Sequence, residues 1–97
     1  MFKNKRYCTA GIAERVPLCT QVIMWDLVDH MEVESKDYFQ VFKLSVFDGQ
    51  QRIVHEQEVP QYKKTYDITL CGADPIVGKI YVIDSETYST MLFAEEY

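Results

Sequence analysis

The sequence has little of what marks a catalytic or metal-binding protein. Its four glycines are isolated from one another, so it contains no glycine-rich phosphate loop. Its three cysteines, Cys8, Cys19 and Cys71, lie far apart and their number is odd, which argues against a disulfide scaffold and for a reduced, intracellular chain. The only histidines, His30 and His55, share no ligand spacing with them. We therefore expect no metal and no cofactor, and interpret Cys8 and Cys19 as small buried residues.

Long hydrophobic runs are missing as well. The longest stretch without a charge, Val16 to Trp25, has ten residues, whereas a membrane-spanning helix needs about 20. The N-terminus is basic, but Glu14 and Arg15 interrupt the apolar segment that an export signal would need. We expect a cytoplasmic protein that does not bind membranes.

The charge of the chain disfavours nucleic acid as a partner. The formal net charge is −5, and binding to phosphates depends on clustered Lys and Arg. Two small basic clusters are nevertheless present, at Lys3, Lys5 and Arg6 and at Lys63 and Lys64. We interpret them as solvated surface and keep a weak nucleic-acid-associated regulator as an alternative hypothesis.

The firmest structural prediction is a β-hairpin over residues 38–59. Two apolar runs flank Asp48-Gly49, a dipeptide that tolerates positive φ and closes hairpins. A loop over residues 48–51 would pair Val46 with Ile53, whereas a tighter Asp48-Gly49 turn shifts the pairing by two positions. Both registers place Phe42 and His55 on one face and Phe39 and Val41 on the other.

The other elements follow from spacing and turn residues. Apolar side chains recur every three or four residues from Pro17 to about Val33, which predicts a helix buried over most of its circumference. Short strands are expected at residues 6–12, 65–70, 78–83 and 88–93, with a turn at residues 71–75. The chain of 97 residues then forms a single α+β domain, residues 1–97, with an antiparallel sheet of five to six strands and one long helix packed on one face.

One helix can cover only one face of such a sheet. The second face must be buried by barrel closure, by another copy or by a different protein. We therefore predict a non-enzymatic, self-associating interaction module, a homodimer or a protein bound to a partner, whose contacts are Phe39, Val41, Phe47 and Val54.

A second hypothesis places a small molecule near the densest polar cluster, His55-Glu56-Gln57-Glu58. In a strand, His55 and Gln57 point to one face and the two glutamates to the other, so the four cannot converge on one point. The alternative is a small-molecule binder or enzyme with a pocket between the helix and His55, Gln57 and Tyr66. No catalytic residue is predicted.

Several segments resemble a known family. They are Arg6-Tyr7 with Gly11-Ile12, Pro17 with Trp25, Gln40-Val41-Phe42, HEQEVP at residues 55–60 followed by Tyr62, and YSTMLFAEEY at residues 88–97. Together they make nearly the whole chain similar to a small uncharacterised Firmicute family, the domain of unknown function 960 type. The resemblance implies a bacterial cytoplasmic protein and transfers no catalytic or binding residue.

Overall fold

The computed structural model describes residues 1–70 and 72–97. The described residues form, in chain order, β1 (Lys5–Cys8), α1 (Ala10–Arg15), α2 (Leu18–Asp29), β2 (Phe39–Phe47), β3 (Gln50–Gln57), β4 (Tyr62–Ile68), β5 (Gly78–Asp84), β6 (Tyr88–Phe93) and a C-terminal 3-10 turn (Ala94–Glu96). None of the helices in these residues is long and apolar enough to cross a membrane.

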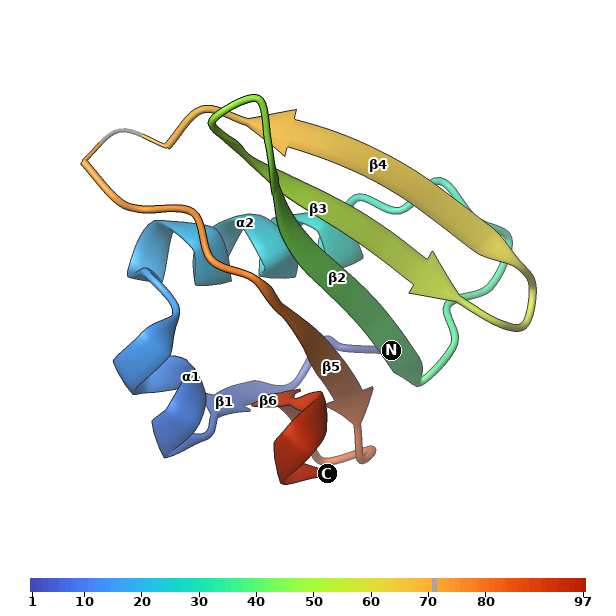
Figure 1. The fold of residues 1–97 in the computed structure, drawn as a ribbon. Helices are drawn as coiled ribbons and strands as arrows, with labels where there is room; N and C mark the ends of the chain where they lie inside the picture. Colours follow the sequence, from blue (N-terminus) through green and yellow to red (C-terminus); the bar gives the residue numbers. More distant parts are fainter. Residues whose placement is uncertain (71) are drawn as a thin grey trace.

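All six strands belong to one sheet in the order β1-β6-β5-β2-β3-β4. Neighbouring strands are antiparallel except β1 and β6, which run parallel. The prediction of a purely antiparallel sheet with one long helix is therefore wrong in two respects, although the α+β class and the strand number hold. Helix α2 lies across one face, and the opposite face has no helix layer (Figure 1). Because β1 and β4 are free edges, the sheet does not close into a barrel.

The β2–β3 hairpin adopts the tighter of the two expected registers. Asp48 and Gly49 have φ values of 52° and 76°, so the two-residue turn twists in the sense that the strands require. Leu44 lies opposite Ile53, two positions from the pairing of the longer loop. The predicted inner face holds through the middle of the hairpin, where Phe42 and Ile53 are buried.

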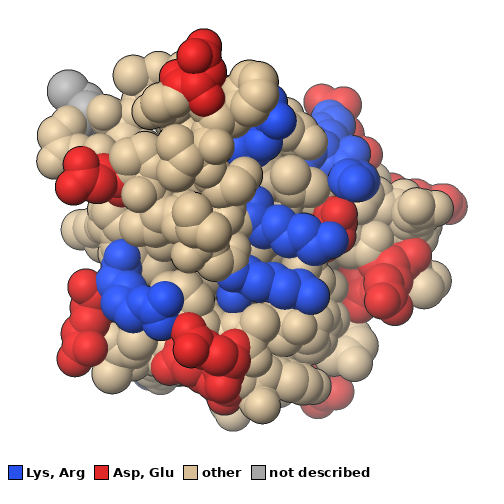
Figure 2. All heavy atoms as spheres, in the orientation of Figure 1, with Lys and Arg blue, Asp and Glu red and all other residues tan. Residues whose placement is uncertain are grey.

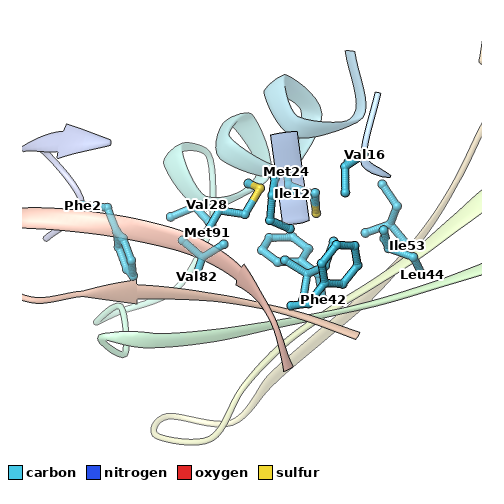
Figure 3. Close-up of a cluster of buried hydrophobic side chains, with 12 residues drawn as sticks. Phe2, Ile12, Val16, Met24, Val28, Phe42, Leu44, Ile53, Val82 and Met91 are labelled. Atoms are coloured by element: carbon cyan, nitrogen blue, oxygen red, sulfur yellow. The ribbon is translucent and has the colours of Figure 1, made fainter. Parts of the chain in front are cut away.

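The hydrophobic core lies between α2 and the inner face of the sheet (Figure 3). Met24 and Val28 of α2 are fully buried there together with Phe42 and Ile53 from the central strands. Phe2 joins the same cluster from the N-terminus. Each such side chain contributes roughly 1.5–3 kcal/mol through the removal of apolar surface from water.

Helix α2 ends earlier than predicted and buries a different stripe. It stops at Asp29 instead of near Val33, and its buried residues are Thr20, Met24 and Val28. Leu18 and Val22, expected on the core side, are 73% and 50% exposed. The sequence is apolar almost all round this helix, so spacing alone could not select the face that packs.

The cysteine prediction is also wrong where the structure tests it. Cys8 and Cys19 are both exposed, Cys8 at the end of the edge strand β1 and Cys19 in the first turn of α2. The third cysteine, Cys71, and with it part of the turn expected at residues 71–75, lies outside the described residues.

The N-terminal strand is shorter than predicted because Thr9 begins a helix. Its side-chain oxygen accepts a hydrogen bond from the Ile12 amide at 3.3 Å. The Thr9 hydroxyl in turn donates to Glu96 Oε1 at 2.7 Å, and the Phe93 amide donates to the same oxygen at 2.8 Å. The C-terminal turn therefore supports the start of α1, a contact across the whole length of the chain.

A buried glutamine holds the connection between β4 and β5 against the sheet. Gln51 is fully buried, its Nε2 donates to the Ile76 carbonyl at 3.1 Å, and its Oε1 accepts from the Ile76 amide at 2.8 Å. The same Nε2 donates to the Ser45 carbonyl at 3.0 Å. One side chain thus satisfies both backbone groups of a residue outside any strand.

Candidate functional site

The face of the sheet opposite α2, here called the open face, carries no helix layer (Figure 1). Along β3 and β2 as far as Ser45, buried side chains alternate with half-buried or exposed ones, and the latter point to this open face. Figure 2 shows it with basic side chains across its middle, while most of the acidic side chains in this view lie toward the margin. The open face therefore differs in charge from the rest of an acidic protein.

A groove of about 530 Å³ lies in the open face. Its lining combines an aromatic and apolar part with charged residues of both signs, namely Asp37, Tyr38, Phe39, Val41, Lys43, Glu56, Gln57, Glu58, Lys79 and Tyr81. The residues come from β5, from β2 and the two residues before it, and from the end of β3 and the residue after it, and these three strands are adjacent in the sheet. The antiparallel register thus brings together segments more than 20 residues apart in the sequence.

Aromatic rings form one part of this surface. The ring centroids of Phe39 and Tyr81 are 4.7 Å apart, and the C-terminal Tyr97 packs edge-on against both, at 5.6 and 5.5 Å. Tyr97 itself remains 76% exposed. The C-terminus therefore extends the aromatic surface without covering it.

Most charges on the open face are paired within the molecule. Glu56 lies 3.3 Å from Lys43 and 3.7 Å from Lys63. Arg52 binds the carboxylate of Asp67 with two hydrogen bonds of 2.8 and 2.9 Å, which lower the pKa of Asp67.

Three charged residues of the groove stand outside these pairs, and one of them, Asp37, accepts hydrogen bonds from backbone amides. Within the described part of the chain, neither Lys79 nor Glu58 has an oppositely charged atom within 4.0 Å. Lys79 lies directly opposite Lys43 in the β2–β5 register, an arrangement of like charges that destabilises a sheet. The groove therefore holds a free positive and a free negative charge.

The four predicted contact residues all lie on the open face. Phe39 and Val41 line the groove, and Val54 is the cross-strand neighbour of Lys43. Phe47 is farther along β2, beneath the guanidinium of Arg52 at 3.8 Å from its ring centroid. The sequence argument missed Tyr81, Tyr97 and Lys79, since finding them requires knowing that β5 lies beside β2.

Two residues of the predicted small-molecule pocket, His55 and Tyr66, lie on the other side of the sheet, whereas Gln57 also borders the groove. His55 is fully buried and is stacked on Phe42, with ring centroids 4.3 Å apart. Gln57 is buried as well, and its amide holds Asp37 N, Ser35 O and Pro60 O. These contacts give the pair a structural role, because they fix the loop after α2 to the end of β3.

Tyr66 is half-buried beyond them, in the edge strand β4. Burial and a hydrogen bond with Tyr66 raise the pKa of Tyr62 to about 12. Tyr62 in turn meets the imidazole of His55 edge-on at 5.3 Å. The aromatic contacts therefore continue the buried packing around His55.

The hydrogen bonds assign the proton on His55. Gln40 Nε2 donates to both Asp37 O and Gln57 Oε1 at 2.7 Å, so its Oε1 is the acceptor facing His55. His55 Nε2 lies 2.6 Å from that oxygen and must carry the hydrogen. Among the residues that the structure describes, Nδ1 is then a buried acceptor without a partner. Burial lowers the pKa of His55 to about 4, so the side chain is neutral near pH 7.

Comparison with known proteins supplies a family. Residues 5–96 match the family model described as a Staphylococcal protein of unknown function (DUF960). The chain belongs to the DUF960 family. The resemblance noted in the sequence is thereby confirmed. No match was found among the curated proteins.

The DUF960 protein also shares its fold with a solved structure, the crystal structure of a protein of unknown function from Enterococcus faecalis. The TM-score is 0.85 at 19% sequence identity, over 97% of this chain and 91% of the other. At this identity the likeness shows the fold alone.

The basic clusters of the DUF960 protein do not merge into one patch. Lys5 and Arg6 lie in β1 and Lys63 and Lys64 in β4, at opposite edges of the sheet. Arg6 is held by Asp29 and lies over the ring of Trp25 at 4.6 Å. In residues 1–70 and 72–97, no three His, Cys, Asp or Glu side chains come together as metal ligands would.

Proposed function

We propose that this DUF960 protein is a non-enzymatic interaction module that associates with a second copy through the open face of its sheet. The supporting observation is the asymmetry of the sheet. Helix α2 and a hydrophobic core cover one face, while the other presents Phe39, Val41 and Tyr81 in an open groove. A contiguous apolar patch with a polar rim is typical of protein interaction surfaces.

The size of the molecule fits this proposal. A standard interface buries about 800 Å² on each partner. The principal extents of 35 × 27 × 21 Å allow a sheet face of that order. A second copy would remove the half-buried apolar side chains from water, and that removal drives association.

The chemistry around His55 supports a non-enzymatic role. An acid or base must reach its substrate within hydrogen-bonding distance. His55 is fully buried and its protonated nitrogen already donates to Gln40. Glu56 and Glu58, its neighbours in sequence, line the groove on the opposite face and cannot share a substrate with it.

Substitution of the open face tests the proposal. Val41→Lys and Val54→Lys together should convert the native protein to a monomer, as measured by light scattering on a gel-filtration column, because they place two charges at half-buried apolar positions of the open face. The matched control is Val22→Lys on the exposed side of α2, which should leave the mass unchanged. A double variant that folds and keeps the native mass would overturn the proposal.

A second candidate is a small ligand in the same groove. The groove volume of about 530 Å³ lies in the range of small-molecule sites. Its lining includes a cation beside an aromatic ring, since Lys79 Nζ lies 5.6 Å from the centre of the Tyr81 ring. This candidate predicts a monomer that purifies with bound small-molecule mass. Tyr81→Ala should remove that mass while the protein stays folded.

A further inference from the structure

The groove holds a self-complementary pair of charges that defines how two copies would dock. We propose that Lys79 of one copy pairs with Glu58 of the other, in a two-fold dimer whose two sheets cross at an angle. This inference rests on the proposed self-association and adds the contacts and the orientation. Both residues line the groove and both are exposed.

The first support is that both charges are free. The other lysines and acids around the groove are engaged, with Glu56 between Lys43 and Lys63. Asp37 accepts hydrogen bonds from the Phe39 and Val59 amides at 3.0 and 3.3 Å. Lys79 faces Lys43 across the β2–β5 pair, and a carboxylate added beside Lys79 would offset the repulsion between the two.

The second support is where the two charges lie along the strands. Val41 is opposite both Glu56 and Tyr81 and marks the middle level of the groove. Lys79 lies two residues from that level in one direction, since it pairs with Lys43. Glu58 follows β3 and lies two residues from Glu56 in the other direction.

Lys79 is on β5 and Glu58 follows β3, so the two charges also lie on opposite sides of β2. A two-fold axis in the plane of the interface that passes near Val41, at right angles to the line from Lys79 to Glu58, exchanges these two ends. It places the Glu58 end of each copy over the Lys79 end of its partner, and the contact forms twice. Such an interface uses the same patch on both copies, and that patch must be complementary to itself. The groove meets this requirement, because its free positive charge and its free negative charge lie on opposite sides of an apolar middle.

A charge-exchange experiment tests the docking. Lys79→Glu and Glu58→Lys should each raise the dimer dissociation constant about tenfold or more, because each places like charges opposite one another twice. Mixing the two variants should restore near-native affinity in a heterodimer, since both contacts are then of opposite sign. Native mass spectrometry with one variant labelled with ¹⁵N distinguishes the heterodimer from the homodimers.

The control pair is Lys3→Glu with Glu14→Lys, two exposed residues outside the groove lining that change the net charge by the same amounts. These variants should dimerise like the native protein. Weaker homodimers whose heterodimer is restored, with controls unchanged, would support the inference. A native dimer that both groove variants leave intact would overturn this docking but not the proposed function. A native protein that stays monomeric would overturn both.

Discussion

Acidification should destabilise the fold through His55, which is buried in its neutral form. Its pKa in the folded protein is about 4, against an ordinary value of 6.5. Between these values the unfolded chain binds a proton that the folded protein excludes, so the free energy of unfolding falls as the pH falls. The penalty is absent above pH 6.5 and complete below pH 4. At about 1.4 kcal/mol per pH unit, lowering the pH from 7.5 to 5 should cost about 2 kcal/mol.

Between pH 7.5 and 5 the change in stability comes mainly from His55. The carboxyl groups with lowered pKa values titrate below this range, namely Asp29, Asp67, Asp84 and Glu96. A loss of 2 kcal/mol in a protein of this size corresponds to a fall in Tm of roughly 8–16 °C. Calorimetry at fixed protein concentration would measure it, and the fluorescence of Trp25, the single tryptophan, gives an independent signal.

The matched variants are His55→Gln and His30→Gln. Glutamine can donate to Gln40 Oε1 as histidine does but does not titrate, so His55→Gln should flatten the dependence whatever its own stability. His30 is exposed at the end of α2, and its replacement should leave the slope unchanged. An unchanged slope in His55→Gln would refute the assignment.

Two further substitutions test contacts that hold loops and the N-terminus. Gln51→Ala should lower the free energy of unfolding, measured by urea denaturation, by roughly 1–3 kcal/mol and should speed amide hydrogen exchange at Ile76, because both backbone groups of Ile76 lose their partner. Unchanged exchange at Ile76 would contradict the role given to the Gln51 side chain. Arg6→Ala should lower the free energy of unfolding by no more than about 1 kcal/mol, since the ion pair between Arg6 and Asp29 is solvent-accessible. The same substitution should shift the fluorescence emission of Trp25, because the Arg6 guanidinium lies over the indole ring. A loss several times larger would mean that the pair is far better shielded than its exposure indicates.

The central hairpin was predictable because local chemistry determines it. Asp48-Gly49 adopts the positive φ values that a two-residue turn needs, and alternation assigns the faces of Phe42 and Phe39 in either register. The sequence left two registers open, because both place the same side chains on the same face of the sheet. The turn geometry decides between them.

The N-terminal region was mispredicted because distant residues determine it. Thr9 begins a helix with support from Glu96, and β1 pairs with β6 in parallel, both across more than 80 residues of sequence. In α2, apolar residues surround the axis, so the choice of Met24 over Val22 as a core residue depends on the shape of the sheet beneath. No local pattern contains that information.

The candidate surface was predictable in location and not in composition. The strands carry more apolar side chains than one helix can cover, which predicts that one face of the sheet stays open. Phe39 and Val41 lie in the groove of that face. Lys79 and Tyr81 join them only because β5 pairs with β2 and not with β4. The strand order, which the sequence does not encode locally, thus determines the charge pattern of the surface.

Native mass spectrometry of the untagged protein tests the central claim most directly. The account predicts a species of twice the 11.4 kDa chain mass, without additional bound mass, that dissociates on dilution. A monomer that persists at high protein concentration would contradict it. If that monomer had a small molecule bound, the groove would be a ligand site and not an interface between copies.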